Sequence, residues 1–124
     1  MNDGSTGDGF TILRGDECER SGQWSLVRRS LGLTSFGLNL VEIEPGGDIP
    51  EHDETGRDQE EVFLVLRGSP SLVIDGERHP APEGTFARLD PELRRTVVNE
   101  GDERAQVLIV SAPRTSGYEP MSWA

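Results

Sequence analysis

The stretch Pro45–Gly68, PGGDIPEHDETGRDQEEVFLVLRG, decides the fold of this chain. It opens on a proline and two glycines, passes through an acidic loop, and ends in the apolar run Val62–Leu66, which is too short for an ordinary helix. Alternate residues of a strand share a face, so Glu61 is aligned with Phe63 and Val65. A buried carboxylate is costly unless it is paired or bound to a metal. The stretch therefore predicts a strand that carries an acid toward a site in the core.

The rest of the chain continues the pattern of short apolar runs between glycines and prolines. The clearest further runs are Trp24–Leu31, Phe36–Ile43, Ser71–Ile74, Thr96–Val98 and Gln106–Val110. Short strands separated by turn signals at this spacing are typical of a β-sandwich or barrel, and Asp75-Gly76 predicts a tight hairpin. We therefore predict one all-β domain over residues 10–124. Residues 1–9, which apart from Met1 are Asn, Asp, Gly, Ser and Thr, are expected to form a disordered arm.

Charge narrows the classes of partner. The 124 residues include 12 basic side chains, all of them arginine, against 23 acids, which gives a net charge of −11. Nucleic acids and anionic membrane surfaces require positive patches, so we expect neither as a partner. There is no run of about 20 apolar residues and no basic segment followed by an apolar one at the start, so we expect a cytoplasmic protein. Cys18 is the only cysteine, which excludes an internal disulfide framework.

A lean hydrophobic composition indicates association. Only 33% of the residues are hydrophobic, so a lone small barrel would leave apolar strand faces and sheet edges uncovered. We therefore predict a homodimer. The segments Trp24–Leu31 and Tyr118–Trp123 are candidates to cover those edges on a partner.

Two motifs in order resemble those of the cupin superfamily. In the first, G(x)5HxH(x)3–4E(x)6G, Gly46 and His52 match the start, and Glu61 and Gly68 match the end. In the second, G(x)5PxG(x)2H(x)3N, Gly76, Pro82 and Gly84 match the start, and Asn99 takes the asparagine place after an insertion. The resemblance covers about residues 34–112. It implies a small jelly-roll barrel of two antiparallel sheets that binds small molecules in its interior.

The departures from these motifs fall on the metal ligands. Cupin metal sites usually use three His and one Glu. Here the resemblance keeps His52 and Glu61, puts Glu54 in the second His place, and puts Arg95 in the last. A guanidinium about 4 Å from a cation opposes it by roughly 4 kcal/mol per unit charge at an effective dielectric near 20. We therefore expect Arg95 to take the place of a metal and neutralise Glu61.

Three functions remain open. The first is a small-molecule-binding cupin of unknown specificity, without a complete transition-metal site, whose ligand contacts His52, Glu54, Glu61 and Arg95. In this reading Arg95 holds an anionic ligand or balances Glu61. The second is a metal-dependent oxygenase or isomerase that holds Mn, Fe or a similar divalent ion with the first three of these side chains. The third is a metal-free isomerase or epimerase with His52 as the base. The direction in which Arg95 points separates the first two.

Overall fold

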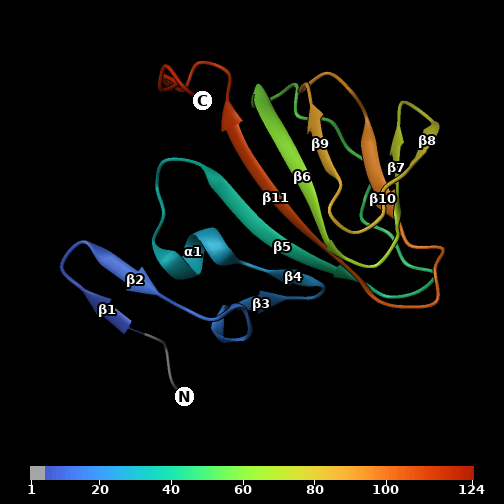
Figure 1. The fold of residues 1–124 in the computed structure, drawn as a ribbon, viewed down its shortest axis with the longest axis horizontal. Helices are drawn as coiled ribbons and strands as arrows, with labels where there is room; N and C mark the ends of the chain where they lie inside the picture. The colour runs from blue at the N-terminus through green and yellow to red at the C-terminus, as the bar shows by residue number, and fades with distance from the viewer. Residues whose placement is uncertain (1–4) are drawn as a thin grey trace.

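The computed structural model describes residues 5–124, and its main strands form two antiparallel sheets around one core (Figure 1). The large sheet has the order β3–β4–β5–β11–β6–β9, and the small sheet has the order β10–β7–β8. The strands of the large sheet are, in that order, Arg20–Ser21, Trp24–Ser25, Gly37–Ile43, Ala105–Pro113, Gln59–Arg67 and Phe86–Leu89. Those of the small sheet are Arg95–Val98, Ser71–Ile74 and Glu77–Pro80. Every pairing in both sheets is antiparallel, so the all-β jelly-roll prediction is confirmed.

The inward faces of the two sheets enclose the hydrophobic core. Val107 of β11 pairs with Val41 of β5 and Val65 of β6, so these three valines project to the same side, and all are buried. Leu72 and Val97 of the small sheet pack in the same cluster. Burying each such side chain contributes roughly 1.5–3 kcal/mol, so this cluster is the main source of stability.

The irregular chain between β5 and β6 runs beside the small sheet. Asp48 and His52 form isolated antiparallel bridges with Val98 and Arg95, the last and first residues of β10. The amide of Ile49 donates to the carbonyl of Val97 at 3.1 Å, which continues the same ladder. The segment therefore acts as an extra edge of the small sheet and places His52 directly opposite Arg95.

Two glycines are required by the turns they occupy. The predicted hairpin is confirmed, because β7 and β8 are joined by Asp75 at φ 49° and Gly76 at φ 83°, and a tight hairpin turn of this type needs both values positive. Gly68 follows β6 at φ 84°, and a Cβ there would lie 2.9 Å from the Cα of Ala105. Any side chain at position 68 would therefore push β6 away from β11.

The predicted strand over Trp24–Leu31 is wrong in its second half. The strand β4 ends at Ser25, and α1 (Val27–Leu31) follows it. The helix stops at Gly32, which takes a left-handed conformation with φ 72° and donates its amide back to the carbonyl of Arg29. A short apolar run does not distinguish a strand from one turn of helix, which is why the pattern misled.

The N-terminal region also differs from the prediction. Within the expected disordered arm, Ser5–Gly7 forms β1, which pairs with β2 (Phe10–Ile12) as a separate hairpin. Residues 1–4 lie outside the described part of the chain. A short 3-10 helix, η1 (Gly15–Glu17), leads from this hairpin toward β3. Among residues 5–124, no helix is long and apolar enough to cross a membrane.

Candidate functional site

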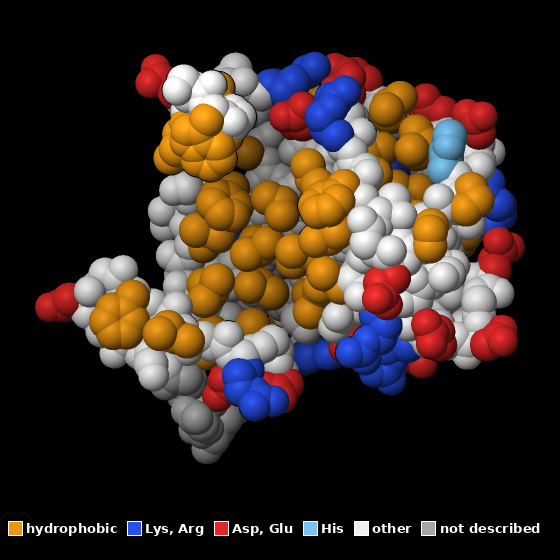
Figure 2. Space-filling view, viewed as in Figure 1, with side chains coloured by type: hydrophobic (Ala, Val, Ile, Leu, Met, Phe, Trp, Pro, Cys, Tyr) orange, Lys and Arg blue, Asp and Glu red, His pale blue; other side chains and the backbone are white. Residues whose placement is uncertain are grey.

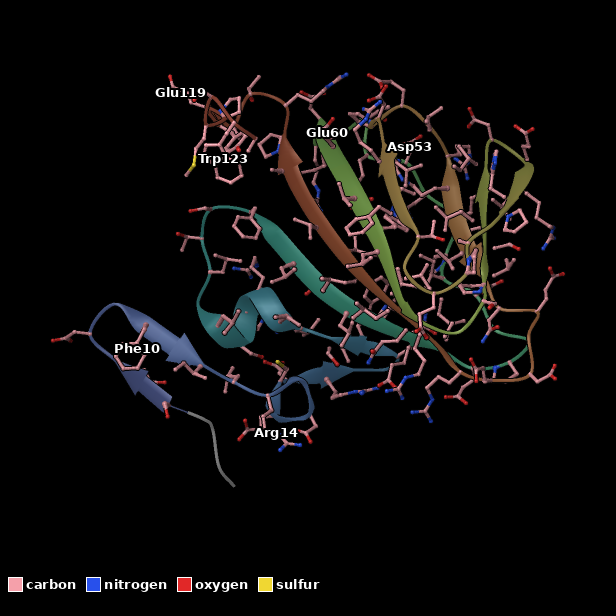
Figure 3. All side chains as sticks on the ribbon, viewed as in Figure 1. Phe10, Arg14, Asp53, Glu60, Glu119 and Trp123 are labelled. Atoms are coloured by element: carbon pink, nitrogen blue, oxygen red, sulfur yellow. The ribbon has the colours of Figure 1, made fainter. Side chains whose placement is uncertain are left out.

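Three elements bring the predicted site residues together at one end of the barrel. His52 lies on the segment beside β10, where its backbone exchanges hydrogen bonds of 3.0 and 2.8 Å with Arg95. Glu61 lies on β6 with its side chain toward the core, as the alternation predicts. Glu54 lies in the loop between them. Figure 3 labels Asp53 and Glu60, the sequence neighbours of these two acids, near this end of the barrel.

The imidazole of His52 faces both carboxylates. His52 Nε2 lies 3.4 Å from Glu54 Oε2 and 3.9 Å from Glu61 Oε1. One ligating atom from each of the three residues lies within 4.8 Å of the others. The acids are largely enclosed, with 12% and 9% of their side chains exposed, whereas His52 is 35% exposed. A molecule arriving from solvent therefore meets the imidazole first.

The backbone fixes the orientation of the imidazole. His52 Nδ1 lies 3.0 Å from the carbonyl oxygen of Pro50, and a carbonyl can only accept, so Nδ1 carries a hydrogen and donates it. In a neutral ring Nε2 then holds a lone pair, which faces the oxygens of Glu54 and Glu61. Three electron-pair donors at these distances repel one another unless a positive charge lies among them. Arg95, whose Nε lies 3.5 Å from Glu61 Oε1, supplies part of that charge, and a metal ion or a cationic ligand group would supply more.

Glu61 is in an environment that opposes its charge. Burial raises the pKa of Glu61, and the nearby charge of Glu54 raises it further, while Arg95 and His52 act in the opposite direction. Glu61 Oε1 has no hydrogen-bond partner, and neither does Arg95 Nε, which lies 3.5 Å away. The pair is an ion pair without a hydrogen bond, so Glu61 retains a tendency to bind a proton.

Arg95 is aimed into the protein, but mainly at the backbone. Its side chain is fully buried. Nη1 donates to the carbonyl of Leu93 at 2.6 Å and more weakly to that of Pro91 at 3.4 Å, and Nη2 donates to the backbone carbonyl of Asp90 at 3.2 Å. Neutralising Glu61, as the sequence predicts, is thus only the smaller part of the role of Arg95. The larger part is to hold the loop before β10, and its enclosed guanidinium has little left to offer an anionic ligand.

These residues fit a complete transition-metal site poorly. Such a site normally has three or four well-oriented donors with supporting hydrogen bonds. Here there are three, and a cation at Glu61 Oε1 would share that oxygen with the Arg95 guanidinium. One imidazole and two carboxylates still suit a hard divalent ion such as Mn²⁺ or Mg²⁺. The anchored Nδ1 of His52 is also the support that a ligating histidine usually has.

Sequence reasoning missed the groups that shape the loop around Glu54. The amide of Glu54 donates to the carbonyl of Pro91 at 2.8 Å, so the loop held by Arg95 in turn positions this acid. Arg57 lies outside it, with Nε 3.7 Å from Glu54 Oε1. Asp53 caps the turn by accepting from the amide and hydroxyl of Thr55. The only visible signal in the sequence was Arg57, four residues before Glu61.

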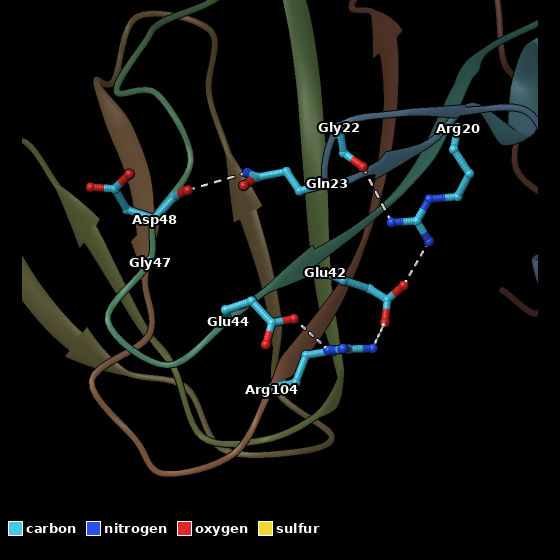
Figure 4. Close-up of a pocket in the computed structure, with 8 residues that line it drawn as sticks. All are labelled: Arg20, Gly22, Gln23, Glu42, Glu44, Gly47, Asp48 and Arg104. Carbon is cyan, nitrogen blue, oxygen red and sulfur yellow. Dashed lines mark hydrogen bonds and ion pairs between the residues drawn. The ribbon is translucent and has the colours of Figure 1, made fainter.

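Other polar groups lie apart from this cluster. His79 is on the exposed hairpin, 3.5 Å from Glu77, as its position after the turn suggests. A pocket of about 500 Å³ lies near the other end of β11 (Figure 4). There Arg20 and Arg104 both bind Glu42, at 2.9 and 3.0 Å. Because these charges neutralise one another, we assign no function to that pocket.

Comparison with known proteins places the chain in a family. The sequence model of the Cupin domain family matches residues 39–111, more than half of the chain, and this range contains the cluster described above. The sequence has no significant match among curated proteins.

Solved structures share the fold over different lengths. A cupin protein from Bacteroides fragilis superposes with a TM-score of 0.77 at 20% identity, covering 93% of this chain and 92% of that one. A Cupin 2 conserved barrel domain protein from Salinispora arenicola has 30% identity over 67% of each chain, with a TM-score of 0.59. A sugar phosphate isomerase of the cupin superfamily from Silicibacter pomeroyi has 29% identity and a TM-score of 0.63. That match covers 72% of this chain and 57% of the isomerase.

Proposed function

Since the chain belongs to the cupin family, we propose that it binds a small molecule at the cluster of His52, Glu54 and Glu61. The observation that carries this proposal is the convergence of three electron-pair donors at a half-open end of the barrel, 3.4 and 3.9 Å apart at the imidazole. A group kept only for stability would not leave a buried carboxylate oxygen without a hydrogen-bond partner. Arg95, with Nε 3.5 Å from Glu61 Oε1, offsets part of the negative charge of the cluster.

This cluster selects ligands that donate hydrogen bonds. Its accessible groups are an imidazole nitrogen and carboxylate oxygens, which accept from hydroxyl or ammonium groups. Arg95 is a positioning residue here, because its Nη atoms donate to the carbonyls of Leu93 and Asp90. The chain should therefore prefer a neutral polyol, sugar or amine to an anion of the same size.

The same geometry supports proton transfer. His52 has the most exposed side chain of the cluster, and an imidazole with its second nitrogen anchored is suited to act as a general base or acid. A metal-free isomerase or epimerase is therefore the catalytic form of this proposal. The similarity to a sugar phosphate isomerase supports a carbohydrate as the substrate class to test first.

A metal-dependent enzyme is the second candidate. It is favoured by one observation, that ligating atoms of His52, Glu54 and Glu61 lie within 4.8 Å of one another. A divalent ion there would offset the charges of the two carboxylates. The Arg95 guanidinium, 3.5 Å from Glu61 Oε1, weighs against it.

Matched probes test the proposed specificity. Binding should be measured calorimetrically for glucose against glucose 6-phosphate, glycerol against glycerol 3-phosphate, and ethanolamine against glycolate, with EDTA present. We expect the uncharged or cationic member of each pair to bind more tightly. Glu54→Gln should weaken that binding by about 10- to 100-fold, the value of one hydrogen bond to a charged group.

Glu51→Gln is the matched control. It alters an acid of the same loop that pairs with Arg94 at 3.3 Å and lies outside the cluster. We expect it to leave binding unchanged. Tighter binding of the phosphorylated members, or equal effects of the two substitutions, would contradict the proposal. A cytoplasmic location and the absence of nucleic-acid and membrane partners stay predictions from the sequence.

A further inference from the structure

Two loops border the candidate site at the end of the barrel where β11 ends. Residues 53–58 carry Glu54 and lead into β6, and residues 90–94 lead into β10 and supply the carbonyls that bind Arg95. The end of β11 and the start of β6 lie side by side at the top of Figure 1, and Figure 2 shows acidic and basic side chains gathered at the same end. Charged contacts at this end can therefore set the distance between the two loops.

Arg114, the first residue after β11, binds an acid of each loop. Its Nη2 lies 2.7 Å from Asp58 Oδ1 and 2.8 Å from Glu92 Oε1, and its Nε lies 3.2 Å from the same oxygen of Asp58. The backbone amide of Arg114 also donates to the carbonyl of Asp58 at 3.2 Å. Each terminal nitrogen of a guanidinium carries two hydrogens, so Nη2 can serve both carboxylates at once. We call the group of Arg114, Asp58 and Glu92 the clasp.

Both arms of the clasp end beside the groups that position Glu54. The amide of Arg57 donates to the carbonyl of Glu54 at 3.1 Å, so Glu54 and Asp58 belong to one closed turn. On the other side, Pro91 is the neighbour of Glu92, and its carbonyl accepts from the amide of Glu54 at 2.8 Å. The clasp and this hydrogen bond therefore join the same two loops in parallel.

The backbone of Asp58 depends on the support that the clasp gives it. Asp58 has a φ of 51°, in the left-handed region that residues other than glycine rarely adopt. A conformation of this kind persists only where its surroundings hold it, and here Arg114 binds both the carbonyl and the carboxylate of Asp58. Without Arg114, the turn that carries Glu54 should relax.

We propose that Arg114 is a positioning residue for the ligand site, because the clasp holds the Glu54 turn to the loop before β10 and so keeps Glu54 beside the imidazole of His52. The apparent affinity of a site falls with the fraction of molecules in which the site is formed. Losing the clasp should therefore weaken ligand binding while every ligand-contacting group stays present. The effect on affinity rests on the proposed function, whereas the effect on the position of Glu54 does not.

Calorimetry with glucose, glycerol and ethanolamine measures the effect on affinity, using the probe that binds the wild type most tightly. Arg114→Gln removes two exposed ion pairs and should raise the dissociation constant about 3- to 10-fold. Glu92→Gln removes one of them and should raise it about 2- to 5-fold. The double variant should bind no more weakly than Arg114→Gln alone, because Glu92 acts through Arg114.

Arg104→Gln is the matched control. Arg104 lies directly before β11, at the opposite end of the strand from Arg114, and also binds two acids, Glu42 at 3.0 Å and Glu44 at 2.7 Å. Its replacement should leave the dissociation constant within about twofold of the wild-type value. The homodimer stays a prediction from the sequence, so all variants are compared at one protein concentration. Equal losses of affinity in Arg104→Gln and Arg114→Gln would overturn the proposal.

Hydrogen exchange followed by NMR tests the position of Glu54 without any ligand. In Arg114→Gln and Glu92→Gln the amide of Glu54 should exchange at least about fivefold faster, while the amides of β5 should exchange as in the wild type. If none of the three probes binds the wild type, the proposed function fails and the exchange rates alone decide on the clasp. An unchanged exchange rate at Glu54, faster exchange throughout β5, or wild-type affinity for a bound probe in Arg114→Gln would overturn the proposal.

Discussion

Replacing Arg95 with methionine should be far more damaging than replacing Glu61 with glutamine, although the two side chains form an ion pair. Methionine removes the donors to the carbonyls of Leu93 and Asp90, 2.6 and 3.2 Å away, and leaves them in a buried site. A hydrogen bond from a charged group contributes about 1.5–3 kcal/mol, so the loss should be about 3–5 kcal/mol. Glu61→Gln should cost under about 1 kcal/mol at neutral pH, because burial already opposes that charge.

Urea unfolding of a double-mutant cycle measures the difference. With an m-value near 2 kcal/mol/M, the Arg95→Met midpoint should fall by about 1.5–2.5 M. The coupling energy between the two substitutions should be no more than about 1 kcal/mol, because Arg95 Nε and Glu61 Oε1 are 3.5 Å apart without a hydrogen bond. All variants must be compared at one protein concentration, since association would add to the stability.

Arg94→Met is the control for the loss of a positive charge. Arg94 is exposed and pairs with Glu51 at 3.3 Å, so its replacement should cost less than about 1 kcal/mol. The reasoning would be refuted if both single variants lost about 4 kcal/mol and the double variant lost no more than either one. That result would make the ion pair, and not the loop carbonyls, the main partner of Arg95.

Three further predictions concern the site and the turns. As the pH rises from 4.5 through the raised pKa of Glu61, the wild type should lose stability relative to Glu61→Gln, because the folded state binds this proton more tightly than the unfolded state. Melting temperatures of both proteins, measured in EDTA at pH 4–8, test this, and parallel curves would contradict it. Asn99→Ala should lower the free energy of unfolding in urea by about 2–4 kcal/mol, because the buried side-chain amide donates to the carbonyls of Ile43 and Glu103, both at 2.8 Å, and accepts from the amide of Gly101. A loss under about 1 kcal/mol would show that water replaces these hydrogen bonds. Gly68→Ala should lower the melting temperature more than Gly76→Ala, because only position 68 combines a positive φ with a contact of 2.9 Å.

The sequence predicts the barrel because its signals are local. Glu61 precedes an alternating strand, so its inward direction follows from the period of two. The turn at Asp75-Gly76 needs positive φ at both residues, which these residue types accept readily. The spacing of the two motifs also brings His52, Glu61 and Arg95 to one place, and their role in ligand binding stays a prediction.

The parts that could not be predicted depend on tertiary contacts. The direction of Arg95 is set by three carbonyls of the loop that precedes it, and no residue pattern marks that loop as its partner. The N-terminal hairpin has a composition typical of disordered chain, and the pairing of Ser5–Gly7 with Phe10–Ile12 leaves no alternation to recognise. Which apolar side chains of β5, β6 and β11 point to the core could not be told from the sequence, because both faces of these strands are apolar.

The metal content of the purified protein tests the central claim, that the site binds its ligand without a transition metal. Untagged protein should be dialysed and analysed by inductively coupled plasma mass spectrometry, with the melting temperature measured before and after chelation. We predict well under one equivalent of Mn, Fe, Ni, Cu or Zn, and little change in melting temperature. Near-stoichiometric metal that survives dialysis, and is lost in both His52→Ala and Glu61→Ala, would contradict the account and favour the metal-dependent enzyme.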